Sequence, residues 1–177
     1  MATKTASRVF AGLAAGAAIM AGTAVPASAD VQAQAINFRT PFDCGQVWNA
    51  NTRTNHNPQN SVDFQRSDAL GKNVHASASG KVTTVRDLGG TSYGKYIVID
   101  HGSGWTTLYA HLNSFNTSVG ASVTTSSIIG KVGSTGGSTG PHLHYEQRAS
   151  GVVKRVVLNG LAIKYFGNTT VTSSTGC

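Results

Sequence analysis

The sequence predicts a single, mainly β domain of antiparallel strands with long loops and little helix. Short segments rich in β-branched and aromatic residues recur from residue 73 onward, and glycine-containing turns separate them. No window shows a sustained helical period of apolar residues. The chain holds 21 glycines and only 12% charged residues, a composition that fits a sheet domain with many tight turns.

Six segments are expected to be strands. In chain order they cover residues 81–86, 95–100, 105–110, 128–132, 142–147 and 152–158. Turn signals lie between them, at residues 88–90, 101–104 and 134–140. Beyond the last strand, residues 169–175 form a serine- and threonine-rich tail that we expect to be held only by Cys177.

Residues 1–29 have the features of a secretory signal peptide. Lys4 and Arg8 give a positive start, residues 9–25 are small and apolar, and Ala-Ser-Ala at 27–29 is a cleavage signature. An uncleaved membrane anchor is the alternative, but the segment is rich in alanine and glycine and the cleavage site follows at once. We therefore expect a secreted, extracellular protein.

After the signal we expect a short N-terminal lead-in, residues 30–42, and one domain with a C-terminal extension, residues 43–177. The formal charge of the whole chain is +7, and a modestly basic secreted protein suits an anionic polymer such as a cell wall. Lysine and arginine are scattered, so nucleic acid is not expected as a partner. No further stretch is long and apolar enough to cross a bilayer. We expect a monomer without stable membrane association.

The chain contains two cysteines, Cys44 and Cys177, one near each end of the expected mature chain. In an oxidising compartment an even pair is most simply a disulfide, which would tie the C-terminus to the N-terminal segment. Zinc thiolates are the alternative, but neither cysteine has a second ligand at the spacing of a zinc finger.

His142 and His144 follow a loop rich in glycine and serine. If this segment is a strand, both imidazoles point to one face while Leu143 points to the other. Two imidazoles on one strand can bind a transition metal, or hold a metal and a reacting water beside it. An isolated pair of this kind is weak evidence, because surface or packed histidines are commoner.

A second group lies upstream, where His56 and Asp63 flank a proline-containing loop. Taken alone, they are more often a loop histidine and a capping aspartate. Together with His144 they supply three ligands and leave a fourth position open to water, which is the arrangement of a catalytic zinc. His111 ends another expected strand, and by strand alternation it shares a face with Tyr109.

Four blocks of sequence resemble the lysostaphin-type (M23) zinc peptidases, which cut peptidoglycan cross-links. The blocks are His56 with Asp63-Phe64, residues 71–76 with 80–82, residues 109–112, and residues 136–146. The C-terminal extension with its cysteine is more similar to the β-lytic and staphylolytic branch than to lysostaphin itself. The resemblance implies a lysostaphin-like open β-sandwich and one Zn²⁺ per chain, with the ligands His56, Asp63 and His144. It also implies that His111 and His142 are catalytic histidines that do not bind the metal.

Two departures from the family pattern concern the upstream blocks. Six residues separate His56 from Asp63, whereas the common family motif is His-x-x-x-Asp. His75 stands where the family often has proline. The wider spacing is that of the looser branch of the family.

The general base is not a glutamate of the usual metallopeptidase motif, because the chain lacks His-Glu-x-x-His. Acid–base work at a zinc-activated water therefore falls jointly to His111 and His142. The single glutamate, Glu146, shares the strand face of the histidine pair if the strand is regular. It either orients a histidine or forms a surface salt bridge. Tyr93 and Tyr109 either line the substrate cleft and donate to the oxyanion, or pack in the core.

The predicted function is that of a secreted zinc endopeptidase that hydrolyses peptide bonds in the stem or cross-bridges of bacterial peptidoglycan. Glycine-containing bridges are expected, since a narrow, glycine-walled cleft favours substrates without bulky side chains. A zinc carboxypeptidase of the D-Ala-D-Ala type is one alternative, but such enzymes pair the upstream motif with Glu-x-x-His, and here Ala149 follows Glu146 at that spacing. A catalytically inactive relative that binds peptidoglycan or activates a separate hydrolase is the other. Such relatives usually lack metal ligands.

Overall fold

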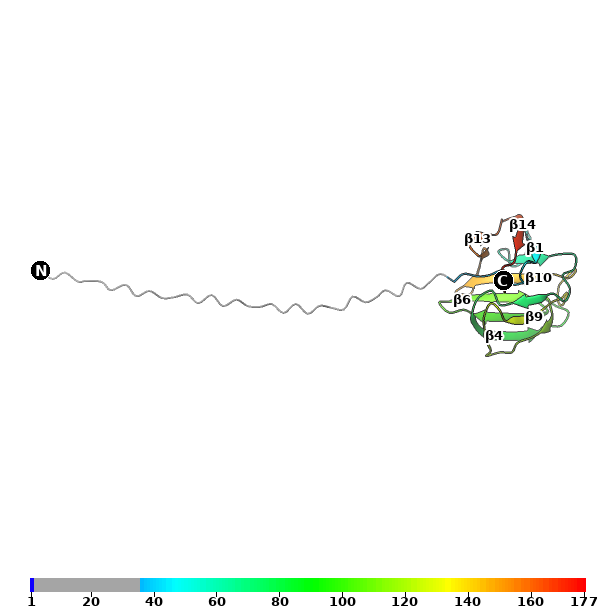
Figure 1. Cartoon of the computed structure of the whole chain (residues 1–177), viewed down its shortest axis with the longest axis horizontal. Coiled ribbons are helices and arrows are strands. Elements are labelled where there is room, and N and C mark those ends of the chain that lie inside the picture. The colour runs from blue at the N-terminus through cyan, green and yellow to red at the C-terminus, as the bar shows by residue number, and fades with distance from the viewer. Residues whose placement is uncertain (2–35) are drawn as a thin grey trace. The chain divides into compact units, whose positions relative to one another are not determined.

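Fourteen β-strands and no helix make up the part of the chain that the computed structural model describes, which is Met1 and residues 36–177 (Figure 1). The prediction of a mainly β domain is confirmed. Apart from Met1, the expected signal peptide lies outside the described residues, as does the lead-in up to residue 35, so both stay predictions. Within the described part, no helix could span a membrane.

Five of the six expected strands are present to within two residues. The whole set is β1 (Val47–Thr52), β2 (Val62–Gln65), β3 (Asn73–His75), β4 (Gly80–Asp87), β5 (Lys95–Asp100), β6 (Trp105–Ala110), β7 (Leu112–Phe115), β8 (Ser122–Val123), β9 (Ile128–Val132), β10 (Leu143–Ala149), β11 (Val152–Lys154), β12 (Val157–Leu158), β13 (Leu161–Ala162) and β14 (Gly167–Thr172).

The sixth expected strand, residues 152–158, is wrong as a continuous element. It is divided into β11, which pairs with β10, and β12, which pairs with β13. Between them Val156 is fully buried, and its carbonyl accepts a hydrogen bond from the amide of Ile163. The chain therefore leaves the large sheet at this point in order to bury an apolar side chain.

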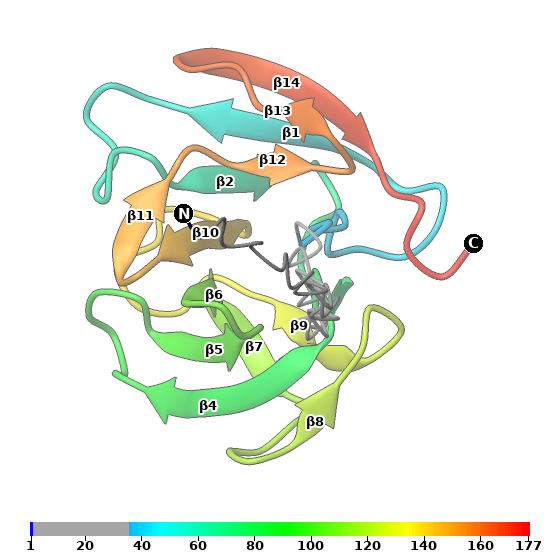
Figure 2. The same ribbon diagram turned by 90° about the vertical axis from the view of Figure 1, so that its left-hand side faces the viewer.

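The largest sheet has nine strands in the order β14-β1-β2-β10-β6-β5-β4-β8, with β11 paired to β10 beside this path. A three-stranded sheet, β3-β9-β7, and the hairpin β12-β13 complete the fold, and the paired strands are antiparallel. Strand β10 lies between β2 and β6, which come from much earlier in the chain (Figure 2). This order brings the two halves of the expected site onto neighbouring strands.

Side chains of both larger sheets form one hydrophobic cluster. In β2 and β10 its members alternate with polar residues, so that Phe64, Leu143 and Tyr145 belong to the cluster. The intervening residues Asp63 and His144 lie on the other face. One face of the sheet therefore builds the core and the other carries the candidate site.

Residues 38–42 belong to the domain, so the expected boundary between lead-in and domain at residue 43 is wrong. Phe38 and Phe42 are buried, and the ring of Phe42 stacks on that of Trp48 with centroids 3.7 Å apart. The backbone is paired as well, because the amide of Arg39 donates to the carbonyl of Ser77. Apolar burial fixes this segment in place although it contains no strand.

The C-terminal tail is an edge strand and is not held by Cys177 alone. Strand β14 pairs with β1 from Gly167–Thr52 to Thr172–Val47. After it, the hydroxyl groups of Ser173 and Thr175 are buried and donate to backbone carbonyls of residues 40–42. The expected disulfide joins Cys44 to Cys177, with their Cα atoms 5.2 Å apart. The tail is thus paired, buried and cross-linked.

Candidate active site

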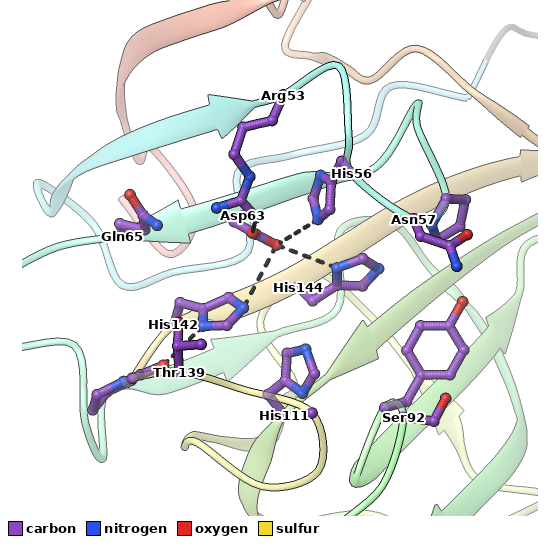
Figure 3. Close-up of a pocket in the computed structure, with 15 residues that line it drawn as sticks. Arg53, His56, Asn57, Asp63, Gln65, Ser92, His111, Thr139, His142 and His144 are labelled. Atoms are coloured by element: carbon purple, nitrogen blue, oxygen red, sulfur yellow. Dashed lines mark hydrogen bonds and ion pairs between the residues drawn. The ribbon is translucent and has the colours of Figure 1, made fainter.

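The register of β2 against β10 places Asp63 directly opposite His144. Their side chains meet on the sheet face away from the core, with Asp63 Oδ1 3.2 Å from His144 Nδ1. His56, in the loop between β1 and β2, brings Nε2 to 3.1 Å from the same oxygen. Figure 3 shows the three side chains converging on one point, and their ligand atoms all lie within 4.8 Å of one another.

The two separations between Asp63 and the histidines fit a tetrahedral zinc site. Zinc–nitrogen and zinc–oxygen bonds of about 2.0–2.2 Å put two ligand atoms of a tetrahedron about 3.3 Å apart, close to the 3.1 and 3.2 Å found here. The donor set of two histidines and one carboxylate leaves one position free for a non-protein ligand. Across the described residues, no second group of three or more histidine, cysteine or acidic side chains converges in this way.

In both candidate histidine ligands, the nitrogen that does not face Asp63 has a partner that fixes the tautomer. Nδ1 of His56 lies 3.2 Å from the hydroxyl of Ser61, which itself donates to the carbonyl of Pro58 and is therefore free to accept. Nε2 of His144 lies 3.0 Å from Glu146 Oε1. With the outer nitrogen held in this way, each neutral histidine can turn the unshared pair of its other nitrogen toward Asp63 once a metal cation takes the place of the proton between them.

Glu146 is fully buried and accepts three hydrogen bonds. The donors are Nε2 of His144, the hydroxyl of Tyr93 at 2.7 Å and Nε of Arg148 at 2.6 Å. Burial alone would raise the pKa of Glu146, but these hydrogen bonds hold that pKa at about 2. The expected alternative of a surface salt bridge is wrong, because the carboxylate lies behind His144 and away from solvent.

The charges around Asp63 and His144 stabilise one another. Burial alone would raise the pKa of Asp63, but hydrogen bonds from His144 and His56 hold it well below its ordinary value. Burial alone would lower the pKa of His144, whereas its bonds to Asp63 and Glu146 raise it. Asp63 is therefore an ionised carboxylate, as a metal ligand must be.

His111 and His142 face each other on the wall opposite the loop of His56, with ring centroids 4.8 Å apart. Nδ1 of His111 lies 2.8 Å from the carbonyl of Thr135, and Nδ1 of His142 lies 2.8 Å from that of Gly140. A carbonyl only accepts, so each Nδ1 carries the proton and each Nε2 is left for other partners. Burial lowers the pKa of His111 to about 4, so this imidazole is neutral near pH 7.

The backbone of His111 has φ of 60°, a conformation that residues other than glycine rarely adopt. The chain changes sheets here, from β6 in the large sheet to β7 in the three-stranded one. Strand alternation predicted that His111 and Tyr109 share a face. This prediction is wrong, because the chain turns a corner at His111. The imidazole lines the pocket, whereas the Tyr109 ring belongs to the core.

The two candidate cleft tyrosines have different positions. Tyr93 lines the pocket, and burial together with its hydrogen bond to Glu146 raises its pKa. Tyr109 as a cleft residue is wrong, because it is fully buried and its hydroxyl is bound to the amide of Ser77 and the hydroxyl of Thr107. Its place on the core face of β6 excludes contact with a substrate.

The pocket that contains these groups has a volume of about 650 Å³. One wall is the glycine-rich loop before β10, which lies directly against the turn before β5. A Cβ atom on Gly136 would lie 2.3 Å from the amide nitrogen of Gly94, so this approach requires glycine. The lining residues are Arg53, His56, Asn57, Pro58, Asp63, Gln65, Ser92, Tyr93, His111, Gly137, Thr139, Gly140, Pro141, His142 and His144.

Sequence reasoning missed several residues that build this site. Arg53 donates to Asp63 Oδ2, Ser61 holds His56, and Thr135 holds His111. Ser61 lies two residues before Asp63, and a small polar residue there could have been considered as a partner for His56. Nothing in the sequence signals the backbone carbonyl of Thr135, because its role depends on the fold of the loop.

Comparison with known proteins identifies the family. The model of peptidase family M23 matches residues 57–156, more than half of the chain. The chain belongs to peptidase family M23. The match begins one residue after His56, so the first candidate ligand lies just outside it.

Two curated relatives match about half of this M23 chain. The chain is 51% identical over 81 residues to the DD-carboxypeptidase/endopeptidase Mpg of Neisseria meningitidis. The aligned segment covers 46% of this chain and 18% of Mpg. It is also 39% identical over 89 residues to the peptidoglycan DD-endopeptidase ShyA of Vibrio cholerae. That aligned segment covers 50% of this chain and 20% of ShyA. This chain therefore spans about a fifth of the length of these relatives.

Solved structures support the same fold. A zinc-containing peptidase from Vibrio cholerae superposes with a TM-score of 0.56 at 29% identity, over 70% of this M23 chain and 40% of that one. The M23 metalloprotease pseudoalterin superposes with a TM-score of 0.61 over 81% of this chain and 88% of that one, at 20% identity. At that identity the likeness concerns the fold alone.

Proposed function

We propose that this chain is a secreted zinc endopeptidase that hydrolyses peptide bonds in bacterial peptidoglycan. The observation that carries the proposal is the convergence of His56, Asp63 and His144 on one point, with His111 and His142 across the pocket. The M23 membership supports hydrolysis of peptide bonds, and the names of the relatives Mpg and ShyA support peptidoglycan as the substrate. We further propose that the protein acts outside the cell as a monomer.

A bound zinc ion would act as a Lewis acid on the scissile carbonyl and would lower the pKa of a water beside it to roughly 7. His56, Asp63 and His144 would hold this one ion. The chain's own groups would do the rest of the chemistry, and they are imidazoles because Glu146, the single glutamate, is buried behind His144.

His111 and His142 are proposed to share the movement of the proton and the stabilisation of the tetrahedral oxyanion. Each ring is fixed by a carbonyl at Nδ1, and each Nε2 is free to bind substrate or water. Because its pKa is low, His111 starts neutral, and its Nε2 can accept a proton. Its Nδ1–H is bound to the carbonyl of Thr135 and only orients the ring. His142 Nε2 lies 3.6 Å from Asp63 Oδ1, beside the metal position.

Metal analysis combined with a turbidity assay on purified cell walls tests this function. We expect one zinc per chain, loss of lysis after chelation, and recovery when zinc is returned. Zinc well below one per chain together with no lysis would favour the alternative of an inactive peptidoglycan-binding relative.

The nature of the cleaved bond is a separate part of the proposal. The sequence favours glycine-containing bridges, whereas the name of the relative Mpg includes a DD-carboxypeptidase activity. Mass spectrometry of fragments released from peptidoglycans with different cross-bridges would distinguish the two. Release of a single terminal amino acid indicates a carboxypeptidase, and release of joined peptides indicates an endopeptidase.

A further inference from the structure

Arg53 places a permanent positive charge on the wall of the pocket. It lies in the loop between β1 and β2, and its side chain is 48% exposed, whereas that of Asp63 is 3% exposed. Apart from the histidines and Tyr93, Arg53 and Asp63 are the ionisable groups among the described residues that line the pocket. No exposed carboxylate therefore neutralises Arg53 on the substrate side.

The contact with Asp63 occupies only part of the guanidinium group. One terminal nitrogen donates to Asp63 Oδ2, and no other hydrogen bond of this side chain is found within the described residues. A guanidinium carries five N–H donors in a planar fork. Donors thus remain free on a half-exposed group, and Figure 3 shows it directed from the loop toward the metal ligands.

The position of Arg53 limits which part of a substrate it can reach. Oδ1 of Asp63 faces the histidines, and Oδ2 accepts the hydrogen bond from Arg53. The free donors therefore lie next to Asp63, beside the point where the candidate metal ligands converge. A substrate group that binds them there is expected on a residue that flanks the cleaved bond.

We propose that Arg53 determines specificity by binding a free carboxylate on the residue that supplies the nitrogen of the cleaved bond. Arginine matches a carboxylate with two parallel hydrogen bonds. A carbonyl-side residue with a single carboxyl uses it in the scissile bond itself, so beside such a residue the free carboxylate belongs to the residue on the nitrogen side. This inference rests on the proposed function and defines its substrate class.

Two kinds of peptide bond leave the α-carboxylate of the residue on the nitrogen side free. In one, the nitrogen comes from a C-terminal residue. In the other, it comes from the side-chain amine of a branched cross-link, which leaves the α-carboxylate free. A bond inside a glycine bridge has no such carboxylate, so Arg53 favours a substrate other than the glycine bridge expected from the sequence.

The test uses the zinc-loaded secreted chain and matched synthetic peptides. One pair is linear and one is branched, and within each pair the residue on the nitrogen side carries either a free carboxylate or its carboxamide. A pentaglycine peptide with a C-terminal carboxamide, which has no free carboxylate, is the fifth substrate. We expect the wild type to prefer carboxylate over carboxamide roughly tenfold to a hundredfold in kcat/KM, the range for hydrogen bonds to a charged group. The two pairs show which source of the carboxylate is used.

The Arg53→Gln variant should lose this preference while keeping one zinc per chain. If Arg53 only held Asp63 in place, both members of a pair would lose activity equally. Arg53→Lys should restore part of the preference, since it keeps the charge but not the fork. Arg86→Gln is the matched control, because it removes the same charge from an exposed position on β4. It should leave the ratio unchanged.

Binding of the same peptides to His111→Ala protein, measured by calorimetry, separates this inference from the proposed function. If the wild type cuts none of the peptides, the proposed function fails, and the binding ratio still decides the role of Arg53. Equal binding and cutting of carboxylate and carboxamide, or an unchanged preference in Arg53→Gln, would overturn the inference. Faster cleavage of pentaglycine would overturn it as well.

Discussion

Replacing Glu146 with glutamine should weaken zinc binding about tenfold while leaving the fold in place. Glutamine has the shape of glutamate, but an NH₂ group replaces one of the two oxygens. Oε1 of Glu146 accepts from His144 and Tyr93, and Oε2 accepts from Arg148. One of these donors must therefore face another donor or turn away.

The structure indicates which contact is lost. The side chain of Arg148 is 25% exposed, whereas that of His144 is 4% exposed. Water can replace a partner at Arg148 and not at His144, so the amide should turn its NH₂ toward Arg148. Loss of one hydrogen bond between charged groups costs about 1.5–3 kcal/mol, and we expect the lower end in the free energy of unfolding.

The effect on zinc comes through His144. Its Nε2–H keeps an acceptor in the variant, but a neutral oxygen replaces a carboxylate and makes the imidazole a weaker ligand. Loss of such partners behind a metal ligand typically costs about 10–100-fold in affinity, and a retained hydrogen bond points to the lower limit. Glu146→Ala, which removes every acceptor, should approach the upper limit.

A competition titration with a chromogenic chelator measures the zinc affinity, and urea unfolding with and without zinc measures stability. Asp68→Asn is a suitable control, because it removes an exposed carboxylate that pairs with Arg66 and Lys72 and does not line the pocket. An unchanged zinc affinity in Glu146→Gln, with equal losses of stability in the loaded and stripped forms, would refute the reasoning. Glu146 would then only be a packing residue.

Three further changes test the site and the fold. His144→Ala should abolish zinc retention, while His111→Ala should keep zinc and lose turnover. Metal analysis together with the wall-turbidity assay checks both variants. A full complement of zinc in His144→Ala would contradict the proposed ligand set. Cys44→Ser should lower the free energy of unfolding by up to about 5 kcal/mol, measured in urea, because the disulfide spans a sequence separation of 133. Gly136→Ala should cut turnover at least about tenfold without loss of zinc, since its Cβ would collide with the backbone of Gly94 and displace the loop that holds His111.

Most of the strands could be predicted because their pattern is local. Strands β5 and β6 are short runs rich in β-branched and aromatic residues, and glycine marks the turns around them. The tail that forms β14 could not be predicted in this way. Among the strands that the structure describes it pairs with β1 alone, about 120 residues earlier in the chain, and its composition of serine, threonine and glycine gives no apolar alternation.

In the candidate site too, the positions of some residues could be predicted from the local pattern and those of others could not. His144 and Glu146 were expected on one strand face, and the structure places them there because β10 is regular. Tyr109 and His111 were expected to share a face, and they do not. The period of two ends at Ala110, and nothing in Tyr-Ala-His-Leu signals that the next residue turns into the left-handed region.

The corner at His111 connects the fold to the chemistry. A residue other than glycine in this conformation costs of order 1–3 kcal/mol, and here the hydrogen bonds from its amide to Tyr93 and from its ring to Thr135 offset that cost. Two of the three candidate metal ligands, Asp63 and His144, lie instead on β2 and β10, two paired strands in the middle of the large sheet, while His56 lies in a loop. Zinc affinity should therefore tolerate changes in the loop of Thr135, whereas turnover should depend on that loop. A site with a rigid metal wall and a loop-supported catalytic wall can change its substrate without rebuilding its metal centre.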